Sequence, residues 1–388
     1  DQSAQRGGRK MRRGTKIQKL KQVLPGIVKD VRHYAKPRVK LHNEGLGDYY
    51  TEGYRSLNQR EWKGVRDTAY DFASWLKVYG YMAVTLGKHP VALTKSFVRY
   101  PWMASYLTVA NMLDRHKLGL RGKQLRYTQE QFYGVVHNSV DVIAKIIERD
   151  ENLNSPNNKR AAKLRAKTVM FDEMTPSIIM AGFPMLDWID IAMSPVCLPG
   201  EVDQNANIMY VDAAERMGLA ADVCPLPSAE VGCAIVDDYP QVGISFITSS
   251  RPCDGSLGAA LFMDRYMKKL PSFTLTPPQR FNEPETNAYA VKDLKNCIRF
   301  IEETYNVKWD WDAFWKKAEE YNKTTQCMLD KWDVNCTPYP QVIGSANLRG
   351  EESEKRHCLS GAAIQRQVGL GCFLEERRNV QRKLPLYD

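Results

Sequence analysis

Cys224 and Cys253 are the two cysteines whose positions could support chemistry. Cys224 ends the short segment Ala220–Cys224, which we expect to be extended, and Cys253 follows the apolar run Val242–Thr248, which is typical of a buried strand. Ligands of a parallel sheet bind beyond the carboxyl ends of its strands, so the two thiols could converge there. Each cysteine also precedes a predicted helix, whose free N–H groups and positive dipole end stabilise a thiolate. The alternative is that both thiols are structural.

Histidine is absent between residues 138 and 356, the long central part of the chain that contains both cysteines. Imidazole is therefore not available there, which disfavours Ser-His catalysis, Cys-His catalysis and most zinc hydrolases. The sequence also lacks a G-x-G-x-x-G turn that opens a helix, a phosphate-binding P-loop, a G-x-S-x-G elbow and any C-x-x-C pair. Thiolates without histidine suit an iron–sulfur cluster better than zinc.

The elements that must position these thiols follow a helical region, residues 56–170. Its first helix places apolar side chains at three- and four-residue steps, namely Trp62, Val65, Ala69, Phe72, Trp75, Leu76 and Tyr79. A second helix, Thr128–Arg149, repeats the pattern, with Thr128 as its cap. Such stripes predict a helical core, and the Asn-rich stretch 152–160 predicts a linker after it.

From about residue 172, short apolar runs alternate with amphipathic helices. After Val242–Thr248 we predict a helix at Asp254–Lys268, a strand at Ser272–Thr276, and helices at Tyr289–Tyr305 and Phe314–Leu329. Strands that alternate with helices indicate βαβ units and a parallel sheet. We therefore predict an α/β fold, in which a Rossmann-like parallel-sheet domain follows an all-helical N-terminal region.

The predicted organisation has four parts. Residues 1–55 form a basic, partly disordered extension, 56–170 the helical region, 171–345 the α/β domain, and 346–388 a divergent or truncated C-terminal segment. Residues 1–40 contain thirteen Lys and Arg against two Asp, so the net charge of +10 belongs to the extension. The extension could meet phosphates or an acidic partner surface, or it could be a solvated arm. Residues 1–40 contain one aromatic residue, Tyr34, which argues against nucleic-acid binding, because proteins that bind single strands interleave aromatic and basic side chains.

The composition excludes several protein classes. With 43% hydrophobic and 26% charged residues, the chain is not wholly disordered. No uninterrupted apolar run of membrane-spanning length occurs, so no membrane span is predicted. The number of cysteines, nine, is odd, and we recognise no secretory signal in the sequence. Both observations argue against a disulfide scaffold and favour a cytoplasmic location.

Three separated segments resemble one known family. Residues 209–235, which include AADVCPLPSAEVGC, 239–255 (YPQVGISFITSSRPCDG) and 302–324 are similar to the 2-hydroxyacyl-CoA dehydratase and benzoyl-CoA reductase family. In that family a helix runs into a cysteine that precedes a second helix, and an apolar strand is followed by small polar residues and another cysteine. The resemblance covers roughly residues 180–335 and is closest to the cluster-binding subunits of the dehydratases.

The resemblance implies that Cys224 and Cys253 are two of the three cysteine ligands of a 4Fe-4S cluster in the 171–345 domain. In that family an ATP-hydrolysing iron–sulfur activator protein supplies one electron. The cluster passes this electron to the thioester carbonyl of a 2-hydroxyacyl-CoA, the ketyl radical loses its hydroxyl group, and the electron is recovered. The implied function is thus that of a lyase of anaerobic metabolism, which takes an acyl-CoA substrate and works with a second homologous subunit.

The chain departs from the family pattern in three places. The third ligand belongs to a second α/β domain, which would begin near residue 340, and Cys336, Cys358 and Cys372 do not match its context. Residues 347–388 lack the family's strand–helix alternation. The family's Glu after a Pro is also missing, so Asp187 or Glu201 could anchor the substrate hydroxyl, or either could be a helix-cap or surface carboxylate.

Two other functions stay open at this point. One is a benzoyl-CoA reductase-like subunit, or another ATP-dependent reductase subunit, within the same superfamily. The other is a non-catalytic α/β partner protein that has lost the cluster and docks another protein. Bound iron distinguishes the enzymes from the non-catalytic partner.

Overall fold

The computed structural model describes residues 40–41, 61–62, 65–113, 122–172, 175–202, 206–250, 255–260, 270–278 and 283–336. Cys253, most of the extension 1–55 and the segment 346–388 lie outside these ranges, so what was predicted for them stays a prediction. Within the described ranges, no helix has both the length and the hydrophobicity needed to cross a membrane.

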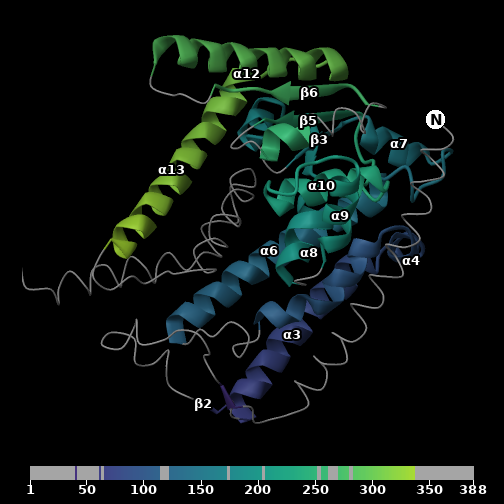
Figure 1. The fold of residues 1–388 in the computed structure, drawn as a ribbon, viewed down its shortest axis with the longest axis vertical. Helices are drawn as coiled ribbons and strands as arrows, with labels where there is room; N and C mark the ends of the chain where they lie inside the picture. Colours follow the sequence, from purple (N-terminus) through teal and green to yellow (C-terminus); the bar gives the residue numbers. More distant parts are fainter. Residues whose placement is uncertain are drawn as a thin grey trace, which may run out of the picture. The chain divides into compact units, whose positions relative to one another are not determined.

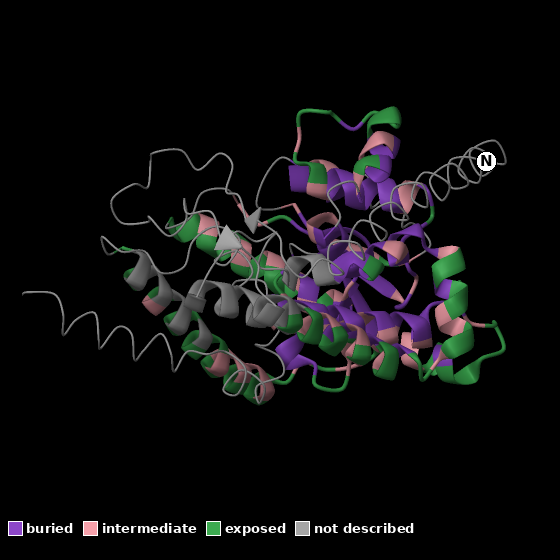
Figure 2. Cartoon of the chain, turned by 90° about the horizontal axis from the view of Figure 1, so that it is seen from below, coloured by how far each residue is buried: buried purple, intermediate pink, exposed green. Residues whose placement is uncertain are grey.

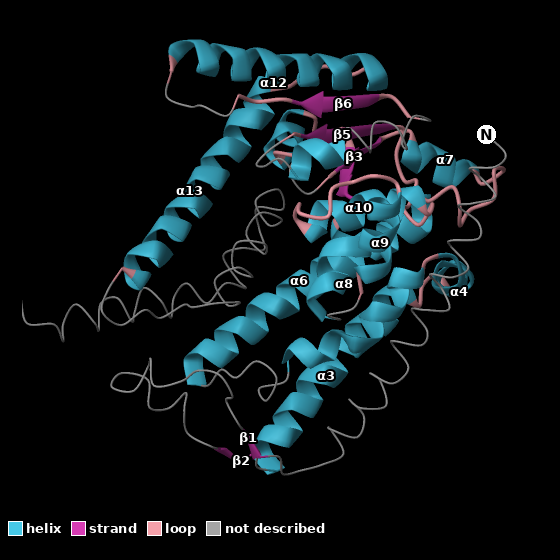
Figure 3. Ribbon diagram, viewed as in Figure 1, coloured by secondary structure: helices cyan, strands magenta, loops and turns pink. Residues whose placement is uncertain are grey.

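A four-stranded parallel sheet confirms the predicted α/β class (Figures 1 and 3). In spatial order its strands are β4 (Asp187–Asp190), β3 (Thr168–Phe171), β5 (Ser245–Ser249) and β6 (Ser272–Leu275). The central strands β3 and β5 are buried along their whole length, so their sequences do not alternate between apolar and polar residues.

The strand predictions were partly right. The predicted strand Val242–Thr248 starts three residues before β5, and Ser272–Thr276 extends one residue beyond β6. β3 and β4 were missed, and β3 lies in the last residues of the stretch 56–170 that was expected to be helical. Both are four-residue strands, too short to show a clear period against the neighbouring helical pattern.

Helices make up most of the remaining described chain. They are α3 (Val65–Leu86), α4 (Pro90–Arg99), a 3₁₀ helix (Pro101–Leu113), α6 (Gly122–Arg149), α7 (Lys159–Arg165), a 3₁₀ turn (Ser177–Gly182), a π-helical turn (Met193–Cys197), α8 (Leu198–Val202), α9 (Ile208–Arg216), α10 (Pro225–Ile235), α12 (Pro284–Tyr305) and α13 (Trp311–Asn335). The helices predicted from the apolar stripes lie within α3, α6, α12 and α13, and residues 255–260 are also helical. The prediction that Thr128 caps its helix was wrong, because α6 begins at Gly122 and Thr128 lies inside it. Trp62 is an exception, because it lies in β2 (Glu61–Trp62), which pairs with β1 (Lys40–Leu41).

The chain separates into two compact units. In the first, which contains the sheet, Val169, Phe171 and Ile247 pack with Cys297 and Ile301 of α12 in one hydrophobic core. Figure 2 shows many buried residues in this part of the chain and many exposed residues on its helices.

In the second unit, α3 packs against α6 through aromatic side chains. The rings of Tyr81 and His137 stack with centroids 3.6 Å apart, and Lys77 Nζ lies 4.1 Å from the centre of the Tyr133 ring. The predicted stripe of α6 is buried at Phe132, Val135 and Val136, as expected for a core face. Phe72 and Leu76 of the predicted α3 stripe are exposed, so the core prediction was wrong for these two residues.

Candidate functional site

The strand order creates a topological switch point between β3 and β5. The chain passes from β3 to β4 on one side of β3, and then returns to form β5 on the other side. In an open parallel sheet, ligands bind beyond the carboxyl ends of the strands at such a point. In the sequence, Cys253 follows β5. The switch point therefore lies at the edge of the sheet where Cys253 was predicted to act as a ligand.

Asp172, which directly follows β3, ties the two strands together at this edge. Its carboxylate accepts hydrogen bonds from the Thr248 hydroxyl, from the backbone N–H of Ser249 at 3.1 Å and from the Thr175 hydroxyl at 2.7 Å. Asp172 is buried. The sequence patterns missed this residue because they missed β3, although an Asp directly after an apolar run is a signal for the end of a strand.

Cys224 lies at the N-terminus of α10, as the N-cap residue, with Pro225 in the first helical turn. Its carbonyl accepts a hydrogen bond from the Ser228 hydroxyl at 2.9 Å. The expectation that Ala220–Cys224 is extended was wrong, since residues 221 and 222 form a turn. Cys224 therefore comes from a helix start within the β4–β5 crossover and not from the end of a strand, but it does precede a helix as predicted.

Gly255, two residues after Cys253 in the sequence, lies beside Cys224. A Cβ atom added at Gly255 would be 3.6 Å from the Cβ of Cys224 and 3.3 Å from Cγ of Pro227. Residues 255–260 are helical. The structure thus brings the segment that follows β5 to the start of α10, although the pairing of the Cys224 and Cys253 thiols itself stays a prediction.

The thiol of Cys224 differs from the buried thiols of the first unit. Cys224 is exposed, whereas Cys197, Cys233 and Cys297 are buried. Burial, together with the carboxylates of Asp238 and Glu230, raises the pKa of Cys233 well above its usual value, and burial raises the pKa of Cys297 to about 12. These two cysteines therefore stay protonated, whereas the thiol of Cys224 is open to solvent and to a ligand.

Acidic side chains gather near the carboxyl ends of the strands. The hydroxyl of Tyr239 donates a hydrogen bond to Glu230 of α10 at 2.5 Å, and both side chains are buried. Burial first, then Glu230, and more weakly Asp172 and Asp190, raise the pKa of Tyr239 well above its usual value. Tyr239 is therefore a neutral hydroxyl that donates its hydrogen bond to Glu230 of α10.

The structure places the two candidate carboxylates differently. Asp187 starts β4, at the opposite end of the sheet from Asp172, and binds Lys145 Nζ at 2.8 Å and Arg149 Nη2 at 2.6 Å. This placement favours a structural carboxylate. Glu201 lies half-buried in α8, which directly follows the π-helical turn at Met193–Cys197.

The π-helical turn also contacts α10. Leu226, two residues after Cys224, packs against the buried cluster of Ala192, Met193 and Cys197. The π-helical turn therefore packs beside the start of α10, and turns of this kind are frequent at functional sites.

Of the two predicted cluster ligands, Cys224 lies within the described residues and Cys253 lies outside them. Within the described ranges, no group of three or more His, Cys, Asp or Glu side chains is arranged to hold a metal ion. The chemistry of Cys224 nevertheless fits an iron–sulfur cluster, because its thiol is exposed at a helix N-terminus and the neighbouring Gly255 has no side chain to fill the space.

The chain was compared with curated proteins and with models of protein families. None of the curated proteins compared with the chain is significantly similar to it in sequence. A protein-family model, described as 2-hydroxyglutaryl-CoA dehydratase, D-component, matches residues 202–348, a range that includes both Cys224 and Cys253. Over these residues the chain is similar to the D-component of 2-hydroxyglutaryl-CoA dehydratase, which confirms the predicted family resemblance and supports a 2-hydroxyacyl-CoA dehydratase-type subunit.

Proposed function

We propose that this chain is the iron–sulfur subunit of a radical 2-hydroxyacyl-CoA dehydratase, with Cys224 and Cys253 as ligands of a 4Fe-4S cluster. The observation that carries the proposal is the contact between Gly255 and Cys224 at the start of α10. This contact brings the segment after β5 to an exposed thiol within the part of the chain that matches the dehydratase model.

When bound, the cluster would supply the single electron that makes the 2-hydroxyl of the acyl-CoA a leaving group. The protein's own residues hold and orient the parts of the chain that carry the proposed ligands. Asp172 fixes the carboxyl ends of β3 and β5 relative to each other, and the start of α10 presents the exposed thiol of Cys224.

Of the two candidate carboxylates, we propose Glu201 as the anchor for the substrate hydroxyl. Asp187 already binds two cations, whereas α8 follows the turn that packs against α10. A Glu201→Gln variant should keep bound iron and lose dehydration activity.

The proposed function requires two protein partners. A second homologous subunit would complete the substrate site, and an ATP-hydrolysing iron–sulfur activator would provide the electron. The third cluster ligand is not assigned, because no cysteine after residue 330 stands in a context that matches the family.

Anaerobic reconstitution tests the ligand assignment. The full chain would be loaded with iron and sulfide, and bound iron and the visible absorption of the cluster would be measured for wild type, Cys224→Ala, Cys253→Ala and Cys336→Ala. Cys336 is the matched control, because its thiol is also exposed. We expect both ligand variants to lose the cluster, because a missing thiolate leaves an iron without its ligand.

Two results would contradict the proposal. Bound iron that neither Cys224→Ala nor Cys253→Ala reduces would remove both residues as ligands. Absence of iron from every variant, wild type included, would favour the non-catalytic partner protein.

A further inference from the structure

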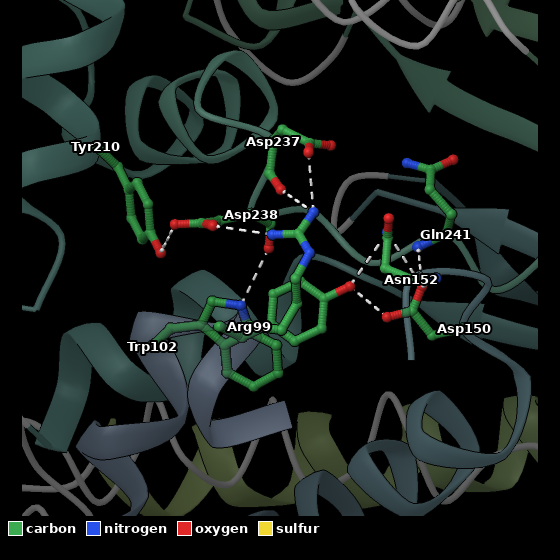
Figure 4. A network of polar contacts seen from close by, with 9 residues as sticks. Arg99, Trp102, Asp150, Asn152, Tyr210, Asp237, Asp238 and Gln241 are labelled. Atoms are coloured by element: carbon green, nitrogen blue, oxygen red, sulfur yellow. Dashed lines mark hydrogen bonds and ion pairs between the residues drawn. The ribbon is translucent and has the colours of Figure 1, made fainter. Parts of the chain in front are cut away.

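A buried polar network holds the C-terminal end of α10 (Figure 4). The Asp238 carboxylate, fully buried, accepts hydrogen bonds from Arg99 Nη1 at 3.3 Å and from the Tyr210 hydroxyl at 3.3 Å. The Asp238 carbonyl accepts a hydrogen bond from Trp102 Nε1 at 3.1 Å, and its backbone N–H donates to the Cys233 carbonyl of α10 at 2.9 Å. The network therefore connects α4 and the following 3₁₀ helix to the end of α10.

Arg99 is the cation of this network. Its Nη2 atom donates to the Asp237 carboxylate at 2.9 Å and to the Asp237 carbonyl, and its side chain is 14% exposed. A buried carboxylate such as Asp238 is costly without a cationic partner, so removal of Arg99 leaves the turn after α10 with uncompensated charge. Asp237 has φ of 62°, in the left-handed region, so this turn depends on its contacts to keep its shape.

Close packing transmits the position of one end of α10 to the other. A Cβ added at Gly232 would lie 1.8 Å from the Tyr210 carbonyl oxygen, so the backbones of α9 and α10 are in direct contact. Tyr210 is also the residue whose hydroxyl binds Asp238, so α9, α10 and the turn form one unit.

The body of α10 is closely packed, and its exposed N-cap residue follows directly from that packed part. The residues from Pro227 to Cys233 are all buried, and Gly255 packs against Pro227 and Cys224. A helix of 11 residues moves as a rigid rod, so a shift at its C-terminal end also displaces Cys224. Sites that bind metals need their ligands held within about 0.5 Å of the productive position.

We propose that Arg99 is a positioning residue for Cys224: through Asp237 and Asp238 it fixes α10, and so sets the place of the thiol that binds the cluster. This inference rests on the proposed function and deepens it, because it gives α4, which lies outside the family match, a part in the cluster site.

Iron release from the loaded protein tests this role. Wild type, Arg99→Met and Arg99→Lys would be reconstituted anaerobically and mixed with a ferrous chelator, and the rate of iron release would be followed below the onset of unfolding. We expect Arg99→Met to release iron about tenfold faster, as is typical when an outer partner of a metal ligand is lost, and Arg99→Lys to be intermediate. The electron paramagnetic resonance spectrum of the reduced cluster should change in Arg99→Met.

Arg165→Met is the matched control, because Arg165 binds the Arg149 carbonyl at 2.9 Å in the same unit. It should release iron at the wild-type rate. If Arg99→Met does not fold, Asp237→Asn removes one charge from the network and should give a smaller increase in the rate.

The inference is overturned if folded Arg99→Met or Asp237→Asn releases iron as slowly as wild type with an unchanged spectrum, or if Arg165→Met accelerates release equally. Failure of the proposed function looks different, since Cys224→Ala would then keep its iron.

Discussion

Burial divides the described cysteines into two chemical groups. Cys233 and Cys297 have no solvent-exposed surface, and burial raises the pKa of both thiols. Cys224 and Cys336 are exposed. Because the thiolate is the reactive form, the two groups should differ in their reaction with an alkylating reagent.

Alkylation of the iron-free protein checks this difference. Under native conditions at pH 8, iodoacetamide should label Cys224 and Cys336 at least about tenfold faster than Cys233 and Cys297, because the buried thiols are both inaccessible and protonated. Peptide mass spectrometry measures the labelling at each site. Equal labelling of Cys233 and Cys224 in the folded protein would contradict the burial of Cys233.

At the scale of elements, the contact between α9 and α10 depends on a glycine. The Cβ position at Gly232 meets the backbone carbonyl of Tyr210, which cannot move aside as a flexible side chain could. Gly80 of α3 gives the opposite case, because nothing lies within 4 Å of its Cβ position.

The two glycines should therefore respond in opposite directions to alanine. Gly232→Ala should lower the free energy of unfolding by about 3 kcal/mol or more, because the helices must separate. Gly80→Ala should raise it by about 0.5–1 kcal/mol, because alanine has the higher helix propensity. Urea denaturation measures both changes, and a tolerated Gly232→Ala would refute the close approach of α9 and α10.

The elements that the sequence predicted best are long helices, whose apolar pattern repeats over several turns. The apolar stripes of α6 and α12 extend over several turns, and both helices lie where they were expected. β3 carries no such pattern, because a buried parallel strand does not alternate. β4 is an edge strand of four residues, of which only Ile189 is buried, and it is too short to show a period. The close approach of Gly255 to Cys224 could not be predicted either, since it depends on how the β4–β5 crossover packs.

At the scale of the whole molecule, Asp150 links three distant parts of the sequence. Its carboxylate accepts hydrogen bonds from the Tyr100 hydroxyl, from the N–H of Asn152 at 3.0 Å and from the N–H of Gln241 at 3.1 Å (Figure 4). Burial, the largest effect, raises the pKa of Asp150 to about 6, against the lowering by these hydrogen bonds.

This raised pKa gives the folding stability a defined pH dependence. Between about pH 4 and 6 the folded protein keeps a proton on Asp150 that the unfolded chain has released, so this group's contribution to stability falls as pH rises. The loss should be at most about 3 kcal/mol. Chemical denaturation at several pH values measures how the free energy of unfolding changes with pH. In Asp150→Asn the free energy of unfolding should lack the decrease due to this group, whereas Glu303→Gln, at an exposed site, should keep it. Identical profiles for wild type and Asp150→Asn would contradict the raised pKa.

The bond between Asp172 and Thr248 joins positions 76 residues apart, and it closes the edge of the sheet where we place the chemistry. Closing so long a loop costs chain entropy before the contacts form, so β3 can pair with β5 only after the whole intervening segment has been made. On the ribosome, α10 and Cys224 therefore emerge before the strand that completes their surroundings. A chain that stalls before Ser245 presents Cys224 without β5 and without Gly255, the neighbour that follows this strand in the folded protein.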